Sequence, residues 1–181
     1  MSLTIPIDLT YPVGDSDVDA LSAALDGTGV RFEIDNGRLL LMSPVKAWHW
    51  DVARRICNLL IAQGLQAFGE QGVRLSRGNL RVPDVSVFHV EPDLDADRHD
   101  PALFALVVEV VSPGSEDDDR LVKPRLYARA GIREYWIADH HPDDPRDASI
   151  ERFALEGEGI AAAYVLRDRV SLQALESTPH P

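Results

Sequence analysis

Two carboxylates stand in parts of the sequence where a purely structural protein has no need of them. Glu109 is the one charged residue in the apolar run FALVVEVV, and residues 104–112 are typical of a strand buried on both faces. Asp84 follows Pro83 at the start of the strand-like stretch VSVFHV. An ionised carboxylate buried in a sheet is costly unless it is paired, protonated or bound to a metal. Glu109 therefore needs a partner.

The partner of Glu109 decides between two interpretations. Alternation along the strand would place Ala105, Val107, Glu109 and Val111 on one face, from which Glu109 could reach an Asp on a neighbouring strand. Two carboxylates that converge at the end of a sheet offer oxygen ligands to a hard cation such as Mg²⁺ or Mn²⁺. The alternative is a structural ion pair between Glu109 and an arginine, and the residues alone leave both open.

A lysine adds a third group to these carboxylates. The chain has only two lysines, Lys46 and Lys123, and Lys123 directly precedes Pro124. Proline is tolerated in the first turn of a helix, so Lys123 should lie at a helix N-terminus, where a cation opposes the helix dipole. This placement favours an ammonium that faces carboxylates or a substrate phosphate over a plain surface lysine. Tyr127 shares the helical face of Lys123 and could orient the lysine or stack on a base.

The elements that must position these side chains follow from periodicity and turn residues. An Asn-Gly pair at 36–37 predicts a β-hairpin within residues 30–43. Helices are expected over 15–26, 46–64 and about 122–130, and strands over 72–76, 79–90, 104–112, 132–139, 150–155 and 162–168. This order predicts an α/β (α+β) fold with a central mixed β-sheet flanked by helices. We expect a single domain over residues 1–181, with a core at about 30–140 and terminal strands in 141–181.

Composition limits the classes of protein that remain. The chain has 181 residues, of which 45% are hydrophobic and 27% charged, as in a soluble globular domain. Neither a bilayer-spanning apolar run nor a signal peptide is evident, so we expect a cytoplasmic protein without membrane contact. The single cysteine, Cys57, excludes an intrachain disulfide. The net charge of −12 repels polyanions, so any contact with DNA must be local.

Several segments in succession resemble the Uma2 family, also called DUF820, of restriction-endonuclease-like proteins. They are EIDNGRLLLMSP, AWHWDVARRICNLL, RVPDVSVF and LVVEVVSPGSEDDDRLVKPRLYARAGIREYWIAD, and the resemblance covers roughly residues 15–140. The resemblance implies the PD-(D/E)XK nuclease core. Asp84 matches the Asp of its PD element and Glu109 the acidic residue of its second element. Val111 stands where the parent motif has Lys, and Lys123 matches the place to which that lysine has migrated.

The resemblance also implies an activity. It suggests a metal-dependent DNA endonuclease, with Mg²⁺ or Mn²⁺ held by Asp84, Glu109 and the backbone carbonyl of Val110. Glu33 and His49 match recurring family positions, although Glu33 could instead pair across the hairpin and His49 could cap or pack the start of its helix. Two other functions stay open. One is a non-catalytic interaction or regulatory module on the same fold, acting as a homodimer, and the other is a small-molecule metallohydrolase.

Overall fold

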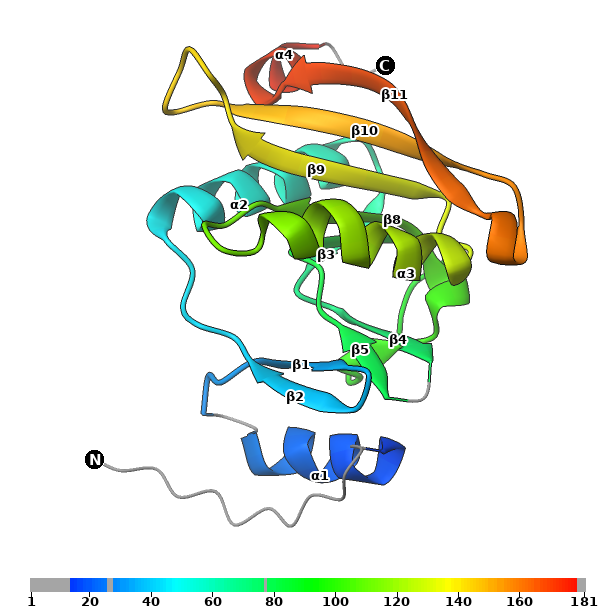
Figure 1. Cartoon of the computed structure of the whole chain (residues 1–181). Coiled ribbons are helices and arrows are strands. Elements are labelled where there is room, and N and C mark those ends of the chain that lie inside the picture. The colour runs from blue at the N-terminus through cyan, green and yellow to red at the C-terminus, as the bar shows by residue number, and fades with distance from the viewer. Residues whose placement is uncertain (1–13, 26–27, 77, 179–181) are drawn as a thin grey trace.

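The computed structural model describes residues 14–25, 28–76 and 78–178, which build two β-sheets flanked by helices (Figure 1). The larger sheet lies in the upper half of the view and the smaller sheet in the lower half. Side chains of both sheets meet in one apolar cluster, where Val73 of the smaller sheet packs with Phe88 and Phe104 of the larger. The predicted mixed α/β architecture is confirmed, but with two sheets in place of one central sheet.

The larger sheet has six strands in the order β11-β10-β9-β8-β6-β3. Its strands are β3 (Gln66–Gly69), β6 (Val85–Phe88), β8 (Phe104–Val110), β9 (Glu134–His140), β10 (Ala148–Glu156) and β11 (Ala163–Ser171). Only the pair β8 and β9 runs parallel; the other neighbours are antiparallel. Parallel neighbours need a crossover connection. Here it is the helical segment formed by η2 (Asp118–Val122) and α3 (Lys123–Arg129).

Helices cover both faces of the larger sheet, so its central strands are buried on both sides. Ile56 of α2 (Ala47–Ala62) and Leu172 of α4 (Leu172–Ser177) pack with Val108 of β8. On the opposite face, Tyr127 of α3 packs with Val107. Figure 1 shows α3 crossing in front of the sheet and α2 lying behind it. Within the described residues, no helix has the length and apolar character needed to cross a bilayer.

The smaller sheet has the strand order β2-β1-β5-β4-β7. Its strands are β1 (Phe32–Asp35), β2 (Arg38–Leu41), β4 (Gly72–Ser76), β5 (Asn79–Arg81) and β7 (Arg98–His99). The predicted hairpin is confirmed as β1 and β2, and Asn36 and Gly37 have the positive φ values of 48° and 76° that its tight turn requires. Helix α1 (Asp15–Leu25) packs on this sheet, while the predicted last residue of that helix, Asp26, lies outside the described residues.

The segment 79–90, predicted as one strand, is two strands in different sheets. β5 ends at Arg81 and β6 begins at Val85, so the chain changes sheets between them. Pro83 lies in this connection, and because proline has no N–H to donate, it disfavours a continuous ladder there. Asp84 therefore lies where the chain enters the larger sheet.

The predicted alternation along β8 holds only from Leu106 onward. Val87 pairs with Leu106 and Phe88 with Phe104, so Ala105 is the extra residue of a β-bulge. The bulge moves Ala105 to the face covered by α2. The expectation that Ala105 shares a face with Val107 and Glu109 is therefore wrong.

The remaining helices and strands match the predicted elements only in part. The two late strands are confirmed as the antiparallel pair β10 and β11, whereas the edge strand β3 and the C-terminal helix α4 are additional elements. Two short 3₁₀-helices, η1 (Pro101–Leu103) and η3 (Gly159–Ala161), complete the described elements.

We expect Ile56→Ala to destabilise the protein by about 2 to 5 kcal/mol, because it leaves a cavity under α2, where Ile56 is fully buried. Ile61→Ala on the same helix is the matched control, since the Ile61 side chain is 52% exposed. Urea unfolding of both variants measures the difference. Equal losses would show that α2 is not anchored through this face.

Candidate active site

Asp84 lies directly before β6 and is held by two other elements. Val85 pairs with Val108, so continuing the antiparallel register places Asp84 opposite Glu109. The Val110 N–H donates a hydrogen bond of 2.7 Å to Asp84 Oδ2, and His49 Nε2 lies 3.3 Å from the same oxygen. The carboxylate is therefore fastened both to the end of β8 and to the first turn of α2.

Glu109 finds its partners on the crossover helix. Its side chain is almost fully buried on the face of β8 that α3 covers. Lys123 Nζ donates to Glu109 Oε2 at 2.8 Å, and the Tyr127 hydroxyl donates to Oε1 at 2.8 Å. Lys123 and Tyr127 are one helical turn apart, as their spacing predicts. The partners are thus a lysine and a tyrosine, in place of the arginine of a structural ion pair.

Lys123 has a second carboxylate partner, which the sequence analysis missed. Asp119 Oδ1 lies 2.8 Å from Lys123 Nζ, and both side chains are buried. The acidic run at residues 115–119 has the composition of a solvated loop, yet Asp119 points inward. Its spacing of four residues from Lys123, and of eight from Tyr127, is the signal that indicates a shared helical face.

The α-helix α3 begins at Lys123 as predicted, but it continues helical backbone that starts at Glu116 and passes through a π-helical turn. The Lys123 N–H bonds to the carbonyl of Asp118, five residues earlier. In an ordinary α-helix the Pro124 ring would clash with the carbonyl of Arg120, and the wider π-turn accommodates it. The argument from the helix dipole therefore does not apply to Lys123, whose position is set by its carboxylate partners.

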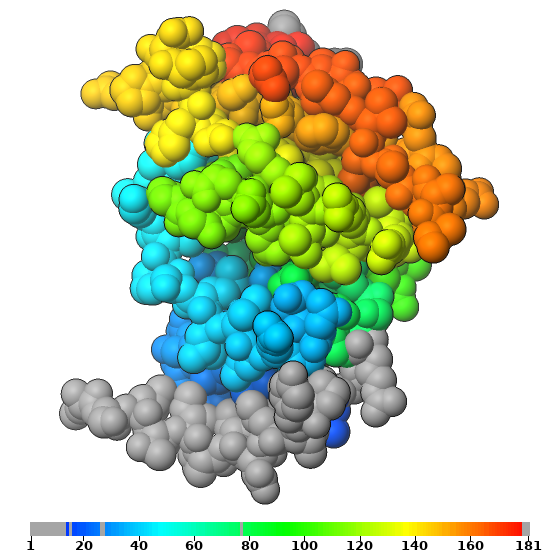
Figure 2. Space-filling view, viewed as in Figure 1, coloured from blue at the N-terminus to red at the C-terminus, as the bar shows by residue number. Residues whose placement is uncertain are grey.

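Asp84, Glu109 and Lys123 line one pocket of about 450 Å³. Figure 2 shows the surface hollowed between the lime-green crossover segment and the cyan segment that leads into α2. The other lining residues come from the linker before α2, the first turn of α2, the end of β8, the loop after it and η2. They are Met42, Ser43, Pro44, Val45, Lys46, His49, Val110, Ser112, Pro113, Ser115 and Asp119.

Glu33 does not line this pocket. Its Oε1 accepts a 2.9 Å hydrogen bond from the Val82 N–H, and its Oε2 lies 3.3 Å from the guanidinium of Arg81. Arg81 is fully buried and also binds Asp35. Glu33 thus pairs with β5 rather than with its hairpin partner β2, and it acts on the pocket through its charge.

Burial and charge shift the pKa values of the central groups. Burial raises the pKa of Glu109 well above its usual value; Lys123 opposes this shift, and Asp84 and Asp119 add to it. Burial alone would lower the pKa of Lys123, but Glu109, Glu33 and Asp119 outweigh it and hold that pKa well above its usual value. Burial, followed by the charge of Glu109, raises the pKa of Tyr127 well above its usual value. Burial thus opposes the charged form of Glu109, whereas the surrounding carboxylates favour the charged form of Lys123.

The chemistry of the oxygen donors fits a hard divalent cation in part. Asp84 and Glu109 present carboxylate oxygens to one pocket, the ligands that Mg²⁺ and Mn²⁺ prefer. In the described part of the chain, no three His, Cys, Asp or Glu residues are grouped so that they could hold a metal ion. A cation would thus rely on two carboxylates and a backbone carbonyl, and Glu109 would have to release Lys123 to bind it.

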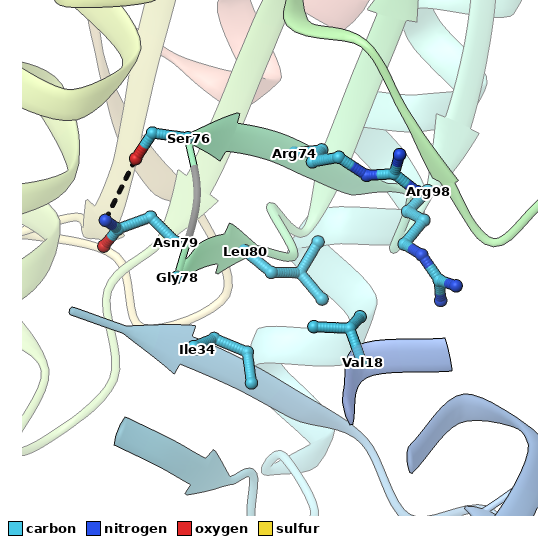
Figure 3. A pocket seen from close by; sticks show the side chains of 8 residues that line it. All are labelled: Val18, Ile34, Arg74, Ser76, Gly78, Asn79, Leu80 and Arg98. Atoms are coloured by element: carbon cyan, nitrogen blue, oxygen red, sulfur yellow. Dashed lines mark hydrogen bonds between the residues drawn. The ribbon is translucent and has the colours of Figure 1, made fainter. Parts of the chain in front are cut away.

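A second crevice, between α1 and the smaller sheet, is no substrate site. Its volume of about 10 Å³ is close to that of one water probe. Figure 3 shows its apolar side chains Val18, Ile34 and Leu80 gathered between the helix and the strands, while Arg74 and Arg98 extend along its rim. This crevice belongs to the packing of α1.

Comparison with known proteins places the fold among nuclease-like proteins. A crystal structure of "a putative nuclease belonging to DUF820" from Anabaena variabilis ATCC 29413 matches with a TM-score of 0.56 and 14% sequence identity, over 94% of this chain and 93% of that one. At this identity the likeness shows the fold alone. The model of the Uma2 family, described as "putative restriction endonuclease", matches residues 16–179, so this chain belongs to the Uma2 family. No curated protein matches the chain.

We expect the metal-free protein to lose stability relative to Glu109→Gln as the pH rises from about 4.5 toward neutrality. The raised pKa means that folded Glu109 keeps a proton that the unfolded chain has released, and this contribution is lost as the pH passes through the folded pKa. Urea unfolding of both proteins in chelator, across this range, measures the difference. Glu91→Gln, an exposed change of the same kind, should show no such trend. A difference that moves in the opposite direction would show that the pKa of Glu109 is not raised.

Proposed function

We propose that this chain is a divalent-metal-dependent endonuclease that hydrolyses phosphodiester bonds in DNA. The observation that carries the proposal is the meeting of Asp84, Glu109 and Lys123 in one pocket. The three residues come from the connection into β6, from β8 and from α3. Membership in the Uma2 family, whose description is "putative restriction endonuclease", supports the nuclease class.

In this proposal Asp84, Glu109 and the backbone carbonyl of Val110 hold Mg²⁺ or Mn²⁺. A bound ion of this kind supplies a water of lowered pKa and neutralises charge on phosphate oxygens. The protein contributes a rigid set of ligands. The Val110 N–H and His49 hold Asp84, and the Tyr127 hydroxyl holds Oε1 of Glu109.

Beside the proposed metal ion, Lys123 is a positively charged group that the protein itself supplies. Its ammonium lines the pocket beside Glu109, within reach of a phosphate bound there. It would donate a hydrogen bond to a phosphate oxygen and stabilise the charge that develops in the transition state. The raised pKa keeps it protonated at neutral pH, as this role requires.

DNA contact is proposed at the rim of this pocket rather than over a broad surface. The chain carries a net charge of −12, which gives no general attraction for a polyanion. Lys46 is exposed and lines the pocket just before α2. A phosphate adjacent to the cleaved bond would be a suitable partner for this lysine.

A second candidate function is a non-catalytic interaction or regulatory module that acts as a homodimer. The net charge favours it, and so does the engagement of both Glu109 oxygens by Lys123 and Tyr127. The edge strand β2 exposes Leu40 and Leu41, which a second copy of the chain could cover. Cleavage assays separate the two functions.

We expect the purified protein to cleave DNA with Mg²⁺ or Mn²⁺, and Lys123→Ala to lower kcat by about two orders of magnitude or more. Asp84→Ala should abolish metal-dependent cleavage. Single-stranded, double-stranded and branched DNA are the substrates to compare. Arg133→Ala and Asp95→Ala, which change exposed charges outside the pocket, should retain activity. Full activity in Lys123→Ala would remove the lysine from the mechanism.

Metal binding has a readout that does not depend on cleavage. We expect Mn²⁺ at about 100 times its Kd to stabilise the wild type by about 2.7 kcal/mol, since the ion binds only the folded state. Glu109→Gln should show a much smaller rise in Tm, and Glu91→Gln the same rise as the wild type. Melting curves with Mn²⁺ and with chelator test this. Equal rises in Tm for all three proteins would place the ion elsewhere.

A further inference from the structure

The Lys123 ammonium is shared between two carboxylates at the same distance. Its Nζ lies 2.8 Å from Glu109 Oε2 and 2.8 Å from Asp119 Oδ1. The lysine is only 7% exposed, so water offers little compensation if both carboxylates are lost. In the proposed function Glu109 is also a ligand for the cation. Glu109 would therefore have to serve both the lysine and the cation, whereas Asp119 would serve the lysine alone.

Asp119 is itself held rigidly. The Ser115 hydroxyl donates to Asp119 Oδ2 at 2.6 Å, which leaves Oδ1 for the lysine. The Tyr135 hydroxyl donates to the Asp119 carbonyl at 2.6 Å, and the Asp119 N–H bonds to the Ser115 carbonyl at 2.9 Å. Side chain and backbone of Asp119 are thus both fixed, and its side chain is 3% exposed.

We propose that Asp119 is a positioning residue that keeps the Lys123 ammonium in the pocket when Glu109 is given up to a divalent cation. The inference rests on the proposed function, because it assigns Glu109 to that cation. A dication repels the ammonium and competes with it for Glu109. Without Asp119 the buried lysine would have to retain Glu109 or leave the pocket. With Asp119 in place, Lys123 keeps a carboxylate partner in either state.

The chain offers an unusually simple test in the absence of metal, since it has two lysines and one cysteine. Acylation of Lys123 relative to exposed Lys46, followed by mass spectrometry, reports how firmly the ammonium is held. Thiol labelling of Cys57, a half-buried residue of α2 that packs against the core, reports general unfolding. The variants are Asp119→Asn and Glu109→Gln, with Asp117→Asn as the control for loss of an exposed acidic charge in the same segment.

The Glu109→Gln background removes the carboxylate that the cation would take. In that background Asp119→Asn should raise the modification of Lys123 about tenfold relative to Lys46, with Cys57 labelling unchanged. Glu109→Gln alone, and Asp117→Asn in the same background, should leave Lys123 protected. Protection that survives Asp119→Asn in this background, or that is lost in Glu109→Gln alone, overturns the proposal. If the double variant exposes Cys57 as well, Ser115→Ala in the Glu109→Gln background decides instead: a rise at Lys123 alone supports the proposal, and no rise overturns it.

Mn²⁺ melting curves then separate this inference from the proposed function. Asp119→Asn should show a smaller Mn²⁺-induced rise in Tm than Asp117→Asn, because Lys123 then competes harder for Glu109. The difference should disappear when both changes are made in a Lys123→Met background, whereas a general effect of charge would persist and count against the proposal. If the wild type shows no Mn²⁺ effect, the metal-dependent function fails, and the labelling comparison still decides whether Asp119 holds Lys123.

Discussion

The ion pair between Glu109 and Lys123 is the interaction on which the arrangement of the pocket depends. Both side chains are buried, so neither charge can be left without the other at a tolerable free energy. Their contact joins the end of β8 to the start of α3. Because β8 and β9 are parallel, the chain between them crosses over the sheet, and α3 is part of this crossover. Asp84 joins the same place through the Val110 N–H, so a change in the register of β8 would displace all three groups.

The residues of this pocket could be predicted where the signal is local. Glu109 stands out because a single charge interrupts a fully apolar run. Lys123 and Tyr127 are four residues apart, and in the structure both donate to Glu109. Asp84 follows a proline at the beginning of a strand. In each case a short window of sequence contains the reason for the placement.

Features that depend on distant partners could not be predicted in the same way. Pro83 indicates a break within residues 79–90. That β5 and β6 belong to different sheets does not follow from this segment, because it depends on which strands pair with them. Asp119 lies in a run of acids that is typical of a solvated loop, and only the π-turn before α3 directs it inward. The buried pairing of Arg81 with Glu33 joins residues 48 positions apart. Such contacts follow from topology rather than from local composition.

The negative charge of the pocket connects its stability to its proposed chemistry. Glu109 experiences Asp84, Asp119 and Glu33 as repelling charges and Lys123 as its main attracting one. A proton on Glu109 and a divalent cation beside it are two ways to relieve the same excess of negative charge. In the metal-free protein Lys123 offsets part of this charge. A cation in the pocket would take its place at Glu109 and let the ammonium face a phosphate. The same cation would reduce the local repulsion of DNA, which the net charge of −12 otherwise imposes on this chain.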